Sequence, residues 1–204
     1  NGEVDGVRYT SFEEINMGGG ADTATVNATV GKLNMGRGGD EATVSATVGE
    51  LNMGRGEDTA TLEEGAFGII NGGSNSDTLN TKEAFGSVLE GGTNGEVDGV
   101  RYTSFEEINM GGGADRATVN EAVNQLNMGA GVDKATVSAT VEQLNLEAGN
   151  DVATLQAGAS GQIDGGSDVD TLNTRASFDS NLVGGNNGLV DGVSYASFEE
   201  INMG

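Results

Sequence analysis

The chain of 204 residues is strongly acidic, with 9 Lys and Arg residues against 32 Asp and Glu residues and a formal net charge of −23 at pH 7. This charge repels nucleic acids and anionic membranes and attracts cations, so we expect neither nucleic acid binding nor membrane insertion. The absence of Cys and His excludes disulfides, thiol chemistry and the commonest transition-metal ligand, and no apolar run approaches the roughly 18 residues of a membrane span.

A long repeat organises the chain. Residues 1–22 recur unchanged as residues 94–115, and a variant of the same text begins at Asn187. The sequence therefore divides into super-repeats 1–93 and 94–186 and a partial copy, 187–204. Because the text begins and stops inside a repeat, we expect residues 1–204 to be one continuous solenoid segment excised from a longer array.

A shorter period lies inside the long one. Aliphatic anchors recur at steps of 18 or 19 residues, and these are Ile15, Leu33, Leu51, Ile70, Leu89, Ile108, Leu126, Leu144, Ile163, Leu182 and Ile201. Between the first anchors, residues 23–30 and 41–48 are rich in Thr and Val and are bounded by Gly turns, as strands are. The sequence therefore predicts an all-β fold, a parallel β-solenoid (β-roll or β-helix) of about eleven 18–19-residue coils, with five coils in each 93-residue super-repeat.

Apolar residues other than the anchors also form columns when the coils are aligned. We expect all of these to be interior packing: Met17, Met35, Met53, Met110, Met128 and Met203; Phe12, Phe67, Phe85, Phe105, Phe178 and Phe198; Tyr9, Tyr102 and Tyr195. An Asn column after the anchors predicts a hydrogen-bonded side-chain ladder. The paired glutamates at 13–14, 106–107 and 199–200 recur with the repeat, which favours a solvated face over an acid–base pair.

An acidic column follows the Gly turns. Eight coils carry Asp at the eighth position from the anchor, and these are Asp22, Asp40, Asp58, Asp77, Asp115, Asp133, Asp151 and Asp170. Coils stack about 4.8 Å apart, so neighbouring charges would repel by about 3 kcal/mol at an effective dielectric near 20. Ca²⁺ would relieve this repulsion, because it accepts several carboxylate and carbonyl oxygens in a loose geometry. In the alternative, which needs no metal, each Asp accepts hydrogen bonds from backbone N–H groups two or three residues further on.

The turns before these Asp residues carry a family resemblance. Residues 72–80, GGSNSDTLN, and residues 165–173, GGSDVDTLN, resemble the nonapeptide G-G-x-G-x-D-x-U-x of the haemolysin-type calcium-binding repeats, the RTX family. The resemblance implies a parallel β-roll in which Asp and loop carbonyls hold Ca²⁺ between coils, with the eight Asp residues as ligands. It covers one loop of each coil, and in every fifth coil Glu96 or Leu189 replaces the ligand.

The repetition also bears on function. Nearly every distinctive residue recurs, so no unique constellation for catalysis stands out and we do not expect an enzyme. We expect a structural segment of a secreted bacterial surface fibre, matrix protein or adhesin, stiffened by calcium ions, located outside the cell or on its surface, and self-associating end to end or laterally. The alternatives are a binding module whose solenoid face recognises ice, a glycan or a partner surface, and the calcium-binding tail of a secreted toxin or protease. Against ice binding, the column beside the Thr column is interrupted by Glu41, Arg116 and Lys134, whereas a flat ice-binding plane should be uncharged.

Overall fold

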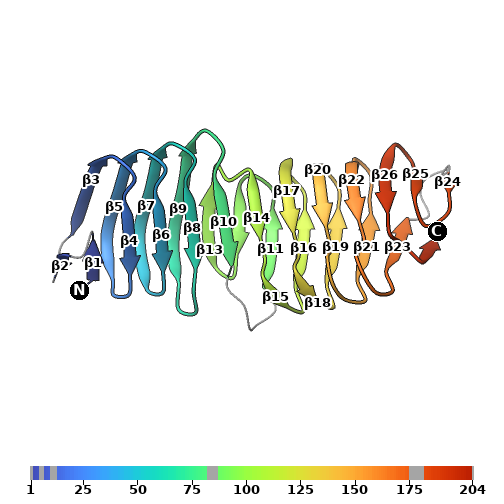
Figure 1. Ribbon diagram of the computed structural model, residues 1–204, viewed down its shortest axis with the longest axis horizontal. Coiled ribbons are helices and arrows are strands. Elements are labelled where there is room, and N and C mark those ends of the chain that lie inside the picture. The colour runs from blue at the N-terminus through green and yellow to red at the C-terminus, as the bar shows by residue number, and fades with distance from the viewer. Residues whose placement is uncertain (1, 5–6, 10–12, 82–86, 175–181, 204) are drawn as a thin grey trace. The chain divides into compact units, whose positions relative to one another are not determined.

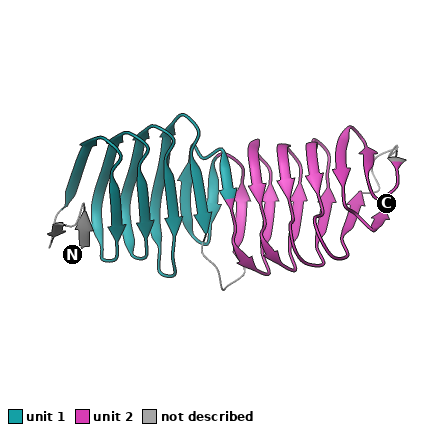
Figure 2. Ribbon diagram, in the orientation of Figure 1, with its two compact units in different colours: residues 1–82, 94–108 teal, residues 83–93, 109–204 magenta. Residues whose placement is uncertain are grey.

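The computed structural model describes residues 2–4, 7–9, 13–81, 87–174 and 182–203, in which every regular element is a β-strand. No helix long and apolar enough to cross a membrane occurs within these ranges. The chain forms two compact units (Figure 2), the first from residues 1–82 and 94–108 and the second from residues 83–93 and 109–204.

Unit 1 is built from two runs of paired strands (Figure 1). The first run is, in order of pairing, β3 (Glu14–Gly19), β5 (Val30–Arg37), β7 (Thr47–Arg55), β9 (Phe67–Ser74), β13 (Val100–Thr103) and β12 (Gly95–Val97). The second run is β2 (Val7–Tyr9), β1 (Gly2–Val4), β4 (Thr23–Val26), β6 (Glu41–Val44), β8 (Thr59–Leu62), β10 (Thr78–Thr81) and β14 (Glu107–Asn109). The chain alternates between the two runs, so each pair of consecutive strands from β3 to β10 makes one coil.

Unit 2 repeats this arrangement. One run is β17 (Val123–Asn127), β20 (Thr140–Asn145), β22 (Ser160–Asp164), β26 (Val193–Ala196), β25 (Gly188–Val190) and β24 (Leu182–Gly184). The other is β11 (Val88–Gly91), β16 (Arg116–Val119), β19 (Lys134–Val137), β21 (Val152–Leu155), β23 (Thr171–Thr174) and β27 (Glu200–Asn202). Two short strands, β15 (Gly112–Gly113) and β18 (Ala130–Gly131), pair at the Gly turns.

The parallel β-solenoid predicted from the sequence is confirmed, with about 9 turns at a spacing of about 18 residues. Successive coils pair in parallel, and Leu33 lies opposite Leu51, which lies opposite Ile70. These three side chains are 0% exposed, as are Met35 and Met53. Because side chains alternate between the two faces of a strand, the Leu, Met, Val and Ala columns of β5 and β6 fill the interior, while the Thr, Asn, Lys and Glu residues of these strands face outward.

The predicted interior position of Phe67 is wrong. Phe105, Phe198, Tyr102 and Tyr195 are buried as expected, but Phe67 is 59% exposed. The register of β7 against β9 shifts between Val48 and Leu51, so Gly68 takes the place opposite Val48 and Phe67 turns outward. The one extra residue of the 19-residue coil is thus absorbed as a bulge. Met203 is likewise 41% exposed, while Tyr9, Phe12, Phe85 and Phe178 lie outside the residues whose side chains are described.

A β-hairpin interrupts each super-repeat, which the anchor spacing did not predict. Strands β12 and β13 are antiparallel, and both turn residues between them have positive φ, 50° at Asp98 and 82° at Gly99, as in a type I′ turn. Strands β25 and β26 repeat the hairpin around Asp191 (φ 51°) and Gly192 (φ 83°).

The hairpins break the single column expected for the anchors. Tyr102 pairs with Ile70, and Tyr195 pairs with Ile163, where the next anchors were expected. Leu89 pairs instead with Ala117, and Ile201 with Leu172. The anchors therefore occupy both runs of strands, because the hairpin uses up the length of chain that the arithmetic assigned to a fifth coil.

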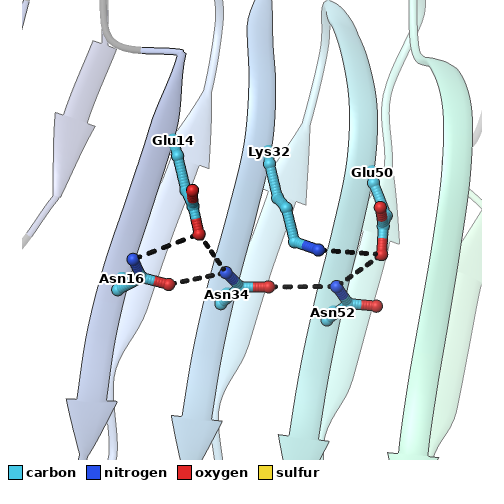
Figure 3. A network of polar contacts seen from close by, with 6 residues as sticks. All are labelled: Glu14, Asn16, Lys32, Asn34, Glu50 and Asn52. Carbon is cyan, nitrogen blue, oxygen red and sulfur yellow. Dashed lines mark hydrogen bonds and ion pairs between the residues drawn. The ribbon is translucent and has the colours of Figure 1, made fainter.

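The predicted Asn ladder is confirmed on the outer face of β3, β5 and β7 (Figure 3). Asn34 donates from Nδ2 to Asn16 Oδ1 at 2.6 Å, and Asn52 donates to Asn34 Oδ1 at 3.0 Å. Beside this row, Lys32 Nζ forms an ion pair with Glu50 Oε1 at 3.3 Å. In unit 2 the same ladder joins Asn109, Asn127 and Asn145.

Candidate functional site

The acidic column lies inside the solenoid, not on its surface. Seven of the predicted Asp residues are at most 1% exposed, and these are Asp40, Asp58, Asp77, Asp115, Asp133, Asp151 and Asp170. Asp22, in the first coil, is only partly buried. Each Asp directly precedes a strand of the second run in unit 1 or of its counterpart in unit 2. Strand pairing therefore holds these residues in register.

One carboxylate oxygen of each of the seven buried Asp residues joins neighbouring coils. In unit 1, the backbone N–H of Asp40 donates to Asp58 Oδ1 at 2.8 Å, and the N–H of Asp58 donates to Asp77 Oδ1 at 3.0 Å. In unit 2, the N–H of Asp133 donates to Asp151 Oδ1 at 2.7 Å, and that of Asp151 to Asp170 Oδ1 at 2.9 Å. We call these rows the Asp ladders. Their bonds run between coils, so the alternative in which each Asp caps its own turn two or three residues on does not describe them.

Glutamates end both ladders, which the sequence reasoning missed. The N–H of Asp77 donates to Glu106 Oε2 at 2.9 Å, and the N–H of Asp170 donates to Glu199 Oε2 at 2.9 Å. Glu106 stays half-buried and Glu199 exposed, in keeping with the solvated face expected for them, and each in addition accepts this one backbone bond. The signal was present in the sequence, because the SFEE text recurs at the same distance after each fourth ladder Asp. Glu96 and Leu189, expected at the ligand position, lie in the hairpins and are exposed.

The second carboxylate oxygen of the ladder residues is buried without a hydrogen-bond partner. This holds for Oδ2 of Asp40, Asp58, Asp77, Asp133, Asp151 and Asp170. Burial away from water disfavours the charged form and raises the pKa of Asp77 and of Asp151 to about 6; repulsion from neighbouring carboxylates adds to the effect, although the ladder hydrogen bond opposes it. A buried carboxylate with an unused oxygen is a position that favours either a proton or a cation.

The glycines of the turns make room for the ladder. Gly56 has φ of +146°, and a Cβ there would lie 1.5 Å from the carbonyl oxygen of Gly38 and 3.2 Å from Asp58 Oδ1. A Cβ on Gly72 would lie 2.8 Å from Asp77 Oδ2. These turn glycines therefore have a direct structural reason, since the backbone of each turn packs against the carboxylate of the same coil.

The donor set fits a hard, oxygen-seeking cation only in part. Within the described ranges, no group of three or more acidic side chains converges as a metal site would require. A cation in the ladder would therefore take the unpartnered Oδ2 atoms and complete its ligand shell with backbone carbonyls, which Ca²⁺ accepts and transition metals do not favour. The ladder residues that would hold it are those with an unused Oδ2, named above.

The fold and the stacked Asp residues define the class of protein, a parallel β-solenoid with ~18-residue coils, consistent with a β-roll. No family model, no curated protein and no solved structure matches the chain.

Proposed function

We propose that this chain is a structural repeat segment of a secreted bacterial fibre, matrix protein or adhesin, of the RTX-like kind, and that Ca²⁺ bound along the Asp ladders stiffens it. The single observation that carries the proposal is the row of buried ladder carboxylates whose Oδ2 atoms have no protein partner. Repeat coils that contact only their neighbours build length, which suits a structural role.

The charge of the ladders explains why a cation would be needed. Neighbouring ladder residues are one coil apart, about 4.8 Å, and their side chains are out of contact with water. At pH 7 a carboxyl with a pKa near 6 is mostly ionised, so the metal-free ladder holds several like charges in a row. Ca²⁺ would turn this repulsion into attraction, and binding would couple to folding, which favours the solenoid where calcium is abundant, outside the cell.

The test is a thermal melt followed by circular dichroism, in 5 mM CaCl₂ and in excess chelator at matched ionic strength, with MgCl₂ as the ion control. We expect the β-sheet signal to melt at a distinctly lower temperature in chelator. Melts that coincide in calcium and chelator would overturn the calcium part of the proposal and leave a solenoid held by its apolar columns alone.

A matched pair of variants locates the effect. Asp133→Asn keeps an Oδ1 acceptor for the Asp115 N–H but replaces the unpartnered Oδ2 with an amide, so it should lose part of the calcium-dependent shift. Asp168→Asn removes the same charge from an exposed turn position with φ of 83°, where the other super-repeat already carries Asn75 with φ of 94°. It should respond to calcium as the parent chain does.

A further inference from the structure

Two arginines stack on the Gly turn of unit 1. Strands β5 and β7 end at Arg37 and Arg55, which are paired in register as the preceding Gly36 and Gly54 are. Both side chains are exposed. Parallel strands lie about 4.8 Å apart, so the two cationic side chains start from adjacent positions of one row.

Neither guanidinium is neutralised by the protein. Within the described part of the chain, the side chains of Arg37 and Arg55 make no ion pair and no hydrogen bond, whereas Lys32, one row away, pairs with Glu50. Two adjacent positive charges repel each other, and no acidic side chain of the described residues offsets this repulsion by pairing with either arginine, although the chain has 32 acidic residues. The pair is thus an unsatisfied positive site on a strongly negative protein.

The surface between them is open and shallow and has a glycine floor. It is lined by Gly18, Gly19, Gly36, Arg37, Gly54, Arg55 and Ser74. The floor must be glycine, because a Cβ on Gly36 would lie 2.0 Å from the carbonyl oxygen of Gly18 and one on Gly54 would lie 2.1 Å from that of Gly36. With no side chains in the way, a small group can approach the backbone between the two arginines.

We propose that Arg37 and Arg55 form a binding site for a single sulfate or phosphate group. A guanidinium presents planar paired N–H donors that match an oxyanion, and two of them can share one doubly charged group. The net charge of −23 repels a long polyanion, so the ligand is a free ion or one such group carried by a sugar. The site does not depend on the Asp ladders and stands whether or not they bind calcium.

The second super-repeat supplies the internal comparison. The row Gly19, Arg37, Arg55 and Ser74 of unit 1 corresponds to the row Gly112, Ala130, Ala148 and Ser167 of unit 2. Ala130 and Ala148 occupy the same paired positions without arginine, so the fold does not require the cationic side chains. The double variant R37A/R55A therefore reproduces a turn that this chain already forms.

The experiment is a titration of the ¹⁵N-labelled full chain with sodium sulfate, with sodium chloride at equal ionic strength as the reference, followed by the arginine Nε–Hε resonances. We expect saturable shifts at Arg37 and Arg55 and none of that size at the exposed Arg101 and Arg116. R37A/R55A should weaken binding at least about tenfold while its circular dichroism and melting temperature stay those of the parent. R37K/R55K, which keeps the charge but not the planar fork, should fall between the two.

Two outcomes overturn the site: shifts that rise linearly and equally at all arginines, or an affinity that R37A/R55A leaves unchanged. A second arm distinguishes the source of the ligand by comparing inorganic sulfate with a monosulfated disaccharide and its desulfated form. Saturable binding of the sulfated sugar but not of the desulfated one supports a carried group. Binding of the inorganic ion alone supports a free-ion site.

Discussion

Raising the pH of the metal-free protein from 4 to 7 should destabilise it, contrary to the usual behaviour of acidic groups in folded proteins. The pKa of Asp77 and of Asp151 is about 6 in the folded chain against a reference value of 3.8. The folded state therefore binds protons more tightly than the unfolded state does. The stabilisation from this difference is complete below pH 3.8 and is lost as the pH rises through 6.

The size of the effect follows from the same pKa values. A carboxyl that moves from 3.8 to about 6 on folding contributes roughly 3 kcal/mol at low pH, and the two residues stand in separate ladders. Burial also raises the pKa of Asp58, Asp133 and Asp170, so these act in the same direction. The expected loss between pH 4 and pH 7 is therefore several kcal/mol, a large part of the stability of an ordinary domain.

The assay is urea unfolding followed by circular dichroism at half-unit pH steps, in chelator and in CaCl₂. Calcium ligands must be deprotonated, so added calcium should restore stability at pH 7 and have little effect at pH 4. Asp151→Asn keeps the Oδ1 acceptor for the Asp133 N–H but cannot titrate, so it should flatten the pH dependence of the metal-free chain. General repulsion within a chain of net charge −23 would also lower stability as the pH rises. If the stability of Asp151→Asn falls with pH as steeply as that of the parent, general repulsion and not the ladder causes the loss, and the reasoning is refuted.

Four further outcomes are expected, each measured by urea unfolding. Leu51→Ala should cost about 2–5 kcal/mol, because Leu51 is 0% exposed and packs between coils that cannot close around the cavity. Gly56→Ala should prevent coil stacking locally, since its Cβ would lie 1.5 Å from a backbone oxygen. Gly99→Ala has nothing within 4 Å of the new Cβ but φ of +82°, so the hairpin should lose only about 1 kcal/mol of backbone strain energy. Phe67→Ser should leave stability nearly unchanged, because Phe67 is 59% exposed.

The short period was sufficient to predict the solenoid, because one coil is the physical unit that the sequence repeats. Leu33, Leu51 and Ile70 recur at 18 and 19 residues, and a parallel coil must bring such residues opposite one another. Interior packing of Met35 and Met53 followed from the same alignment. The spacing alone does not show where the chain stops coiling, because a hairpin of suitable length keeps the 18- or 19-residue step between anchors.

The local text did mark the hairpin. Asp-Gly between short apolar strands, as in Val97–Asp98–Gly99–Val100, is a strong signal for a type I′ turn, and both residues have the positive φ it requires. The repeat conceals this signal, because residues 97–100 also fit the 18- to 19-residue spacing of the coils. Leu89 and Ile201 were assigned to the anchor column for the same reason, and each in fact pairs with the other run of strands.

The acidic column was predicted, but its depth was not. Asp residues that follow Gly turns are usually expected to be solvated. Asp77 is instead 0% exposed, and no local sequence signal indicates this burial. Burial follows from alternation along the chain: Asp77 lies two residues before Leu79, on the same inward face. The ladder bond to the N–H of Asp58 then depends on coil stacking, which local spacing does not specify.

The burial of the column changes what calcium would do for this protein. In an exposed acidic loop an ion would only join neighbouring turns, whereas in the Asp ladders it would replace protons on carboxylates already committed to the fold through Oδ1. Folding and ion uptake would then share the same carboxylates through different oxygens, because Oδ1 accepts the bond between coils and Oδ2 is left for an ion or a proton. On this proposal the solenoid would remain folded in acid without calcium and would need calcium near neutral pH. Glu106 and Glu199, which accept the last N–H of each ladder, would mark where that linkage ends.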